Sequence, residues 1–132
     1  MTGRRRGGCL CGAVRFETAG EPLRVDLCHC RICQKATGQP FFARAVLPAS
    51  QVMLEGEVAW FASTPGFERG FCPSCGTTLF ARRNGGDRLS VAIGTFDEPD
   101  ALTPQAQVWA SRRLPWLARL DDDLPAWPEF PA

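Results

Sequence analysis

Phe71-Cys72-Pro73-Ser74-Cys75-Gly76 contains two of the seven cysteines of this 132-residue chain, and its spacing predicts a metal-binding turn. In a C-P-x-C-G sequence the proline fixes φ and the glycine accepts a left-handed backbone, so the chain turns tightly. Such a turn directs backbone N–H groups at the two sulfurs and partly neutralises them. Two thiolates do not complete a tetrahedral site, so the turn requires two more ligands from elsewhere in the chain.

The remaining five cysteines form two further clusters with short internal spacing. Cys9 and Cys11 form a C-x-C pair between glycines, and this pair supplies the two thiolates that the first turn lacks. Cys28, Cys30 and Cys33 form a C-x-C-x-x-C triplet. Four thiolates make a closed structural zinc site, whereas three leave one position open for water or substrate. The spacing therefore predicts two zinc ions per chain, one structural and one catalytic and labile.

Disulfides and isolated buried thiols account for the cysteines less well. A disulfide framework suits a small secreted chain with an even number of cysteines, but the number here is odd. Residues 1–8 contain three arginines without the apolar segment of a signal peptide, and a C-x-C pair makes a strained disulfide. Unrelated buried thiols remain as the alternative, although chance burial does not produce such spacing in three clusters. The cysteines favour metal binding in a reducing cytoplasm.

Length and composition predict a single domain over residues 1–132, with a disordered basic terminus at 1–6. No stretch approaches the roughly 18 apolar residues that a membrane span requires, so no membrane partner is expected. The formal net charge is only +1, which gives no reason to expect a nucleic-acid partner. The sequence carries no signal for a particular oligomeric state.

Thirteen glycines and eleven prolines leave little room for long helices, so the chain is expected to be mainly β. Alternation and β-branched or aromatic content predict strands at 13–17, 41–47, 52–61 (bent near 55–56), 79–83 and 88–93. The last two flank residues 84–87, a hairpin turn. A short helix is expected at 32–37, capped by Gly38. After Pro99 the proline- and tryptophan-rich chain is expected to wrap over the sheets.

Three residues around the triplet are candidates for supporting roles. His29, the only histidine, lies between Cys28 and Cys30, and on an extended chain its side chain points away from both. We therefore expect it to be packed or hydrogen-bonded on the far face, with a fourth ligand or proton shuttle as the alternative. Three thiolates around Zn²⁺ carry a formal charge of −1. Arg31 and Lys35 are candidates for offsetting that charge or binding substrate carboxylates, with solvated surface residues as the alternative.

Together these motifs resemble a known family. Segments 7–16, 28–38, 71–77, 93–99 and 116–125 are similar to the glutathione-dependent formaldehyde-activating enzyme family, which includes the centromere protein V group. The resemblance implies a β-tent fold of stacked antiparallel sheets organised around a structural zinc site. It also implies two ligand sets, the structural one being Cys9, Cys11, Cys72 and Cys75 and the catalytic one Cys28, Cys30 and Cys33.

The resemblance further implies a zinc-dependent carbon–sulfur lyase acting on a small thiol–aldehyde adduct, like S-(hydroxymethyl)glutathione synthase, with glutathione and formaldehyde as its components. Members often carry histidine in the segment matching 104–109, where this chain has Gln107. The alternative function is a non-catalytic zinc scaffold that binds a protein or other macromolecule through exposed aromatic residues such as Trp60, Phe67, Trp109 and Trp116. We expect these four to form core or pocket wall instead, because a small β domain needs large side chains to fill it.

Overall fold

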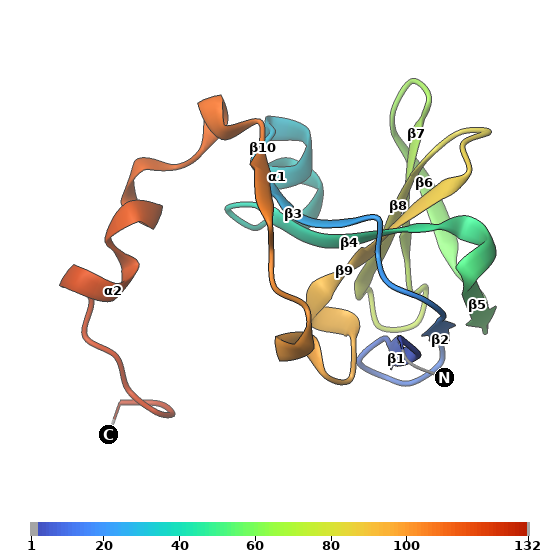
Figure 1. Ribbon diagram of the computed structural model, residues 1–132, viewed down its shortest axis with the longest axis horizontal. Helices are drawn as coiled ribbons and strands as arrows, with labels where there is room; N and C mark the ends of the chain where they lie inside the picture. The colour runs from blue at the N-terminus through green and yellow to red at the C-terminus, as the bar shows by residue number, and fades with distance from the viewer. Residues whose placement is uncertain (1–2, 132) are drawn as a thin grey trace.

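The computed structural model describes residues 3–131, and it consists of a large and a small β-sheet with short helical turns between the strands (Figure 1). The small sheet has the order β1-β2-β5 and the large sheet β10-β3-β4-β9-β8-β7-β6. The strands are β1 Arg5–Gly8, β2 Arg15–Thr18, β3 Arg24–Cys28, β4 Phe42–Pro48, β5 Val52–Glu55, β6 Ala59–Thr64, β7 Phe67–Phe71, β8 Thr78–Arg83, β9 Arg88–Ala92 and β10 Ala106–Val108.

The helical elements are all short. They are α1 Arg31–Thr37, α2 Leu120–Asp123 and the 3-10 turns η1 Ala49–Gln51, η2 Ile93–Thr95, η3 Pro99–Ala101, η4 Ala110–Arg112 and η5 Pro115–Arg119. Gly38 ends α1 at φ 70° and its N–H donates to the Gln34 carbonyl at 2.8 Å, which confirms the predicted helix cap. Within residues 3–131, no helix has the length and apolar character needed to cross a membrane.

The mainly β fold with stacked sheets is confirmed, including the hairpin formed by β8 and β9. The pairing is antiparallel except between β10 and β3, where Gln107 lies opposite Leu27 in a parallel register. The predicted bent strand at 52–61 is instead two strands in different sheets. β5 pairs with β2 and β6 pairs with β7, because the chain turns at Gly56, whose φ is 92°.

Gly56 gives a direct test of this turn. A Cβ at Gly56 would overlap the backbone carbonyl oxygen of Ala13, in addition to the strain of a positive φ. Gly56→Ala should therefore lower the free energy of unfolding by about 3 kcal/mol, measured by urea denaturation with zinc in excess. Gly85→Ala is the matched control, because Gly85 also has a positive φ (69°) but no atom lies within 4 Å of the added Cβ. It should cost only about 1 kcal/mol, and equal losses would contradict the clash.

The core lies where the two sheets face each other. Phe16 of β2 packs edge-on against Phe80 of β8 and against Phe96, with ring centroids 5.7 and 5.1 Å apart. Trp60 is half-buried and stacks on Phe80, as expected for a residue of the core or pocket wall. Cys9 and Cys72 belong to the same buried cluster, so one pair of sulfurs lies at the edge of the hydrophobic core.

The prediction of disorder at residues 1–6 is wrong for Arg5 and Arg6, which form the start of β1 opposite Thr18 and Glu17. The pairing is favoured because β2 would otherwise have a free edge and because the arginines face acidic side chains. Arg5 contacts Glu21 at 3.4 Å. Residues 1 and 2 lie outside the described part of the chain.

The expectation that the chain after Pro99 wraps over the sheets is also wrong. β10 joins the edge of the large sheet, and the segment after it extends away from both sheets (Figure 1, orange to red). Trp109 is 64% and Trp116 49% exposed, so neither is core, and Phe67 is 40% exposed beneath the Arg83 guanidinium. Recurrent prolines explain this path, because a proline has no N–H for a sheet ladder.

Candidate metal centres

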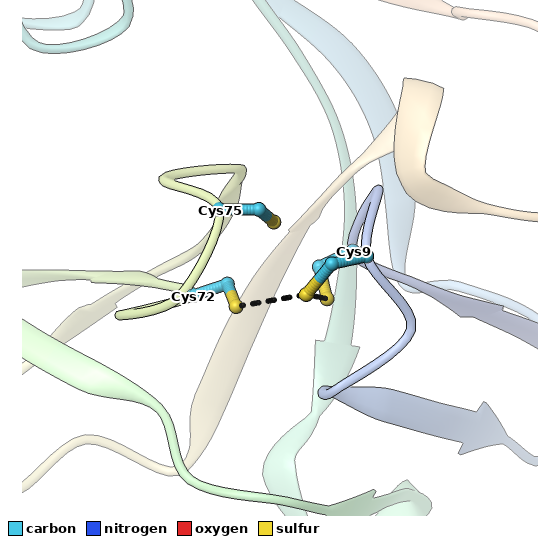
Figure 2. Close-up of side chains that lie close together, drawn as sticks. Cys9, Cys72 and Cys75 are labelled. Carbon is cyan, nitrogen blue, oxygen red and sulfur yellow. Dashed lines mark hydrogen bonds between the residues drawn. The ribbon is translucent and has the colours of Figure 1, made fainter.

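The four cysteines of the two pairs converge at one end of the core. Cys9 and Cys11 follow β1, and Cys72 and Cys75 follow β7, so the two turns face each other (Figure 2). The sulfurs of Cys9 and Cys11 are 3.6 Å apart and those of Cys11 and Cys72 are 3.8 Å apart. All four lie within 4.8 Å of one another.

This spacing fits a tetrahedral zinc ion. A Zn–S bond of about 2.3 Å places two sulfurs of a tetrahedron about 3.8 Å apart. A disulfide would require about 2.05 Å. The donor set is therefore pre-arranged for a metal, and a zinc ion here would have Cys9, Cys11, Cys72 and Cys75 as its ligands.

Glycine and threonine shape both turns. In the second turn the Gly76 N–H donates to the Cys72 carbonyl at 2.8 Å, and Gly76 has the left-handed φ of 78° that the sequence predicts. In the first turn the Cys9 N–H donates to the Val14 carbonyl at 3.0 Å. The Leu10 N–H donates to the Thr77 hydroxyl across the gap at 3.1 Å, so the two turns are joined even without a metal.

Hydrogen bonds around the sulfurs lower the pKa of Cys9 and Cys75 and raise that of Cys11. The Val14 N–H donates to the Cys9 sulfur at 3.2 Å and lowers the pKa of Cys9, and contact with Thr77 lowers the pKa of Cys75 to about 5. Cys11 receives a hydrogen bond from the Ala13 backbone, which acts to lower its pKa, but its contact with Cys9 raises that pKa to about 11. Thiolate is the form that binds metals, and the donors around Cys9 and Cys75 favour it.

The triplet forms a second convergent cluster on the large sheet. Cys28 ends β3, Cys30 is the N-cap of α1, and Cys33 lies in the first turn of that helix. Their sulfurs all lie within 4.8 Å of one another. The Cys33 N–H donates to the Cys30 sulfur at 3.2 Å, which is how this sulfur caps the helix. Cys28 and Cys33 are buried, and Cys30 is partly exposed.

Both cysteine clusters lie within the part of the chain that matches a known protein family. The family described as glutathione-dependent formaldehyde-activating enzyme matches residues 4–112, which include all seven cysteines. The chain belongs to this family. Its relatives include an uncharacterized lyase of Schizosaccharomyces pombe, 34% identical over 77% of this chain and 75% of the relative.

Two further comparisons agree with the family. A protein of Halomonas elongata, whose name assigns it provisionally to the glutathione-dependent formaldehyde-activating enzymes, is 28% identical over 93% of this chain and 69% of its own length. A crystal structure of a Rhodobacter sphaeroides protein superposes with a TM-score of 0.62, covering 78% of this chain and 99% of that one at 21% identity. The fold expected from the family is thus confirmed by a solved structure.

Arg69 on β7 is a site residue that the sequence analysis did not find. Its Nη2 donates to the Cys33 sulfur at 3.2 Å, and its guanidinium lies 5.6 Å from the centre of the Phe42 ring. The pKa of Cys33 falls to about 5, first because the Cys28 thiol donates to it and then because of Arg69. The same contact with Cys33, together with burial, raises the pKa of Cys28. In the sequence, Arg69 is one of two adjacent charged residues, and no motif relates it to the triplet.

His29 lies away from the sulfurs, as predicted. It is fully buried, its ring is 5.5 Å from that of Phe41, and its Nε2–H donates to the Gln107 side-chain oxygen at 2.8 Å. Its Nδ1 has no hydrogen-bond partner within residues 3–131. The parallel pairing of β10 with β3 explains the contact, because it places Gln107 beside the end of β3. Gln107 therefore contacts the residue that lies between Cys28 and Cys30 in the sequence.

Proposed function

We propose that the three-cysteine cluster holds a catalytic zinc and that the protein joins a small thiol, such as glutathione, to an aldehyde such as formaldehyde. One observation carries the proposal. In the described part of the chain this cluster contains three ligands, Cys28, Cys30 and Cys33, whereas the other contains four. A three-ligand site leaves a coordination position for substrate, and the chain belongs to a family named for this reaction.

The reaction forms one carbon–sulfur bond. The thiol loses its proton, its sulfur attacks the carbonyl carbon, and the carbonyl π electrons move to oxygen, which takes up a proton. The product is an S-hydroxymethyl thiol, and the reverse reaction is the lyase direction. When bound, zinc would lower the pKa of the thiol and polarise the aldehyde.

The protein's own contribution is charge and placement. Three thiolates and Zn²⁺ carry a formal charge of −1, and the Arg69 guanidinium beside Cys33 brings the local total to zero. A neutral surrounding makes the approach of an anionic thiolate less unfavourable than a negative one would. The four-cysteine cluster has no open position, so we assign its zinc a structural role.

Cobalt substitution tests this proposal. Protein loaded with Co²⁺ should show thiolate-to-cobalt and d–d absorption bands that shift and saturate on titration with glutathione, because a fourth sulfur completes the tetrahedron. Cys28→Ser should abolish the shift while the cobalt bands of the four-cysteine cluster remain. If no cellular thiol changes the spectrum, the proposed activity is wrong.

A second candidate function has one observation in its favour. Trp109 and Trp116 are exposed on the segment that extends away from the sheets, together with Trp127 (57%) and Phe130 (96%). These side chains would suit a zinc scaffold that binds another macromolecule. This function would be favoured over the enzyme if no thiol changes the spectrum of the cobalt-loaded protein.

A further inference from the structure

The last part of the described chain extends away from both sheets and carries exposed apolar side chains (Figure 1). We call residues 120–131 the C-terminal arm. The large apolar side chains of the arm, each at least 44% exposed, are Leu120, Leu124, Trp127 and Phe130. Apolar side chains gathered in this way on a single copy indicate a surface that is covered in an assembly.

The arm repeats an apolar residue followed by proline every three residues. The repeats are Leu124-Pro125, Trp127-Pro128 and Phe130-Pro131. Proline fixes its own φ and disfavours a helical conformation in the residue before it, so the repeat favours polyproline II. That conformation has three residues per turn, which places the three apolar side chains on one face. In the single copy described here the arm bends at residues 128–130, so docking would straighten it there.

The arm is also acidic. Residues 120–131 contain no lysine or arginine, and their four carboxylates give a formal charge of −4. The four acidic residues are Asp121, Asp122, Asp123 and Glu129. Proline-rich segments dock in grooves lined by aromatic side chains, and the charge of this arm suits a groove that also contains cations.

A groove with both properties lies between α1 and the β6–β7 hairpin. It has a volume of about 640 Å³. Arg31 and Lys35 contribute from the helix and Arg69 from β7, and the described lining contains no aspartate or glutamate. Three positive charges without a carboxylate among them attract an acidic segment.

Aromatic rings form the apolar wall of this groove. Phe61 of β6 lies opposite Arg69 of β7, and Phe71 lies two residues beyond Arg69, so both rings are on one face of the hairpin. Both are exposed, as is Ile32 on the facing helix. The groove therefore offers apolar and cationic side chains together, which matches the apolar and acidic side chains of the arm.

We propose that the groove of one copy binds the C-terminal arm of a second copy, so that two copies exchange arms in a symmetric dimer. The arm points away from the groove of its own copy, because α1 and β10 lie between α2 and the β6–β7 hairpin (Figure 1). A twofold axis brings each arm to the groove of the other copy, and the contact is made twice.

The exchange would also enclose the three-cysteine cluster. Arg69 lines the groove, and its Nη2 donates to the Cys33 sulfur at 3.2 Å. The arm of the second copy therefore forms an outer wall beside this cluster. The inference does not rest on the proposed function, because it requires no thiol or aldehyde chemistry.

Sedimentation equilibrium of the full chain, with zinc in excess, tests the exchange. The wild type should dimerise reversibly, and Trp127→Ser/Phe130→Ser should weaken dimerisation at least about tenfold. Phe61→Ser should weaken it to a similar extent from the groove side. The three side chains are exposed in the single copy, so both variants are expected to fold. Leu23→Ser is the control and should leave the dimer unchanged, because Leu23 is exposed outside both surfaces.

A second pair of variants tests the charge complementarity. Arg31→Gln/Lys35→Gln should weaken dimerisation and make it less sensitive to added sodium chloride, because fewer ion pairs remain to be screened. Arg88→Gln, at an exposed cation outside the groove lining, should change neither the affinity nor its salt dependence.

Mixing the first two variants separates arm exchange from pairing between arms. Trp127→Ser/Phe130→Ser keeps its groove and Phe61→Ser keeps its arm, so the mixture should form a heterodimer, weaker than the wild-type dimer, joined by one arm. If Phe61→Ser dimerises like the wild type and only the arm variant is monomeric, the groove is not where the arm binds and the proposal is overturned.

A monomeric wild type would overturn the exchange as well. If the wild type remains monomeric up to about 1 mM, the second copy is not the occupant of the groove. NMR amide signals of Gly70 and Gly76, which line the groove, would then differ between the wild type and the arm variant only if the arm binds its own copy. Unchanged signals would leave the arm to another macromolecule.

Discussion

Replacement of Cys72 by serine is expected to unfold the protein. Cys72 is fully buried within the core cluster, and its sulfur faces Cys11 across the gap between the two turns. Structural zinc contributes on the order of 10 kcal/mol to folding, which is comparable to the entire stability of a typical domain. A serine oxygen is a poor substitute for thiolate at such a site. The loss of one ligand should therefore remove most of the stability that joins the small sheet to the large one.

Circular dichroism and native mass spectrometry would measure this effect. Cys72→Ser should lose its cooperative thermal transition, whereas Cys28→Ser, the matched change in the three-cysteine cluster, should keep it. The zinc content of Cys28→Ser should fall from two ions to one. A Cys72→Ser protein that melts cooperatively and retains two zinc ions would show that the four-cysteine cluster does not hold the fold.

The second prediction with a large effect is a loss of activity in a protein that keeps its fold. Cys30→Ser should lower the catalysed rate of adduct formation by at least about 100-fold, because the three-ligand site loses a thiolate and with it the zinc. The fold should persist, since serine is itself a favourable N-cap and keeps an acceptor for the Cys33 N–H. NMR exchange spectroscopy with ¹³C-formaldehyde and glutathione would measure the rate above the uncatalysed background.

Gln39→Ala provides the control for this experiment. Gln39 is exposed just beyond α1, so its replacement should leave both rate and zinc content unchanged. A Cys30→Ser protein with normal catalysis and two zinc ions would remove this cysteine from the proposed ligand set.

Most features of the site that the sequence predicts are encoded within a few residues. The turn at Cys72–Gly76 follows from proline and glycine chemistry, and the orientation of His29 follows from the alternation of an extended chain. The convergence of distant cysteine pairs was also predictable, because two thiolates need two more.

The unpredicted parts depend on how distant strands pair. Arg69 meets Cys33 only because the β6–β7 hairpin lies beside α1, a relation that no local pattern encodes. The division of 52–61 between two sheets depends on a close approach of Gly56 to Ala13. The extended segment after β10 was missed because aromatic content alone does not distinguish core residues from exposed ones.

Cys30 links the three-cysteine cluster to the stability of α1, because it belongs to that cluster and is also the N-cap of the helix. The Cys30 sulfur caps α1 by accepting the Cys33 N–H, and it is also one of the three candidate metal ligands. The first turn of the helix and a bound ion would therefore share this sulfur. The same helix carries Arg31 and Lys35 on its exposed face. If zinc binds at this cluster as proposed, its occupancy and the stability of the first turn of α1 would be reciprocally coupled: zinc would stabilise the start of the helix, and whatever stabilises that start would raise the affinity for zinc by the same factor.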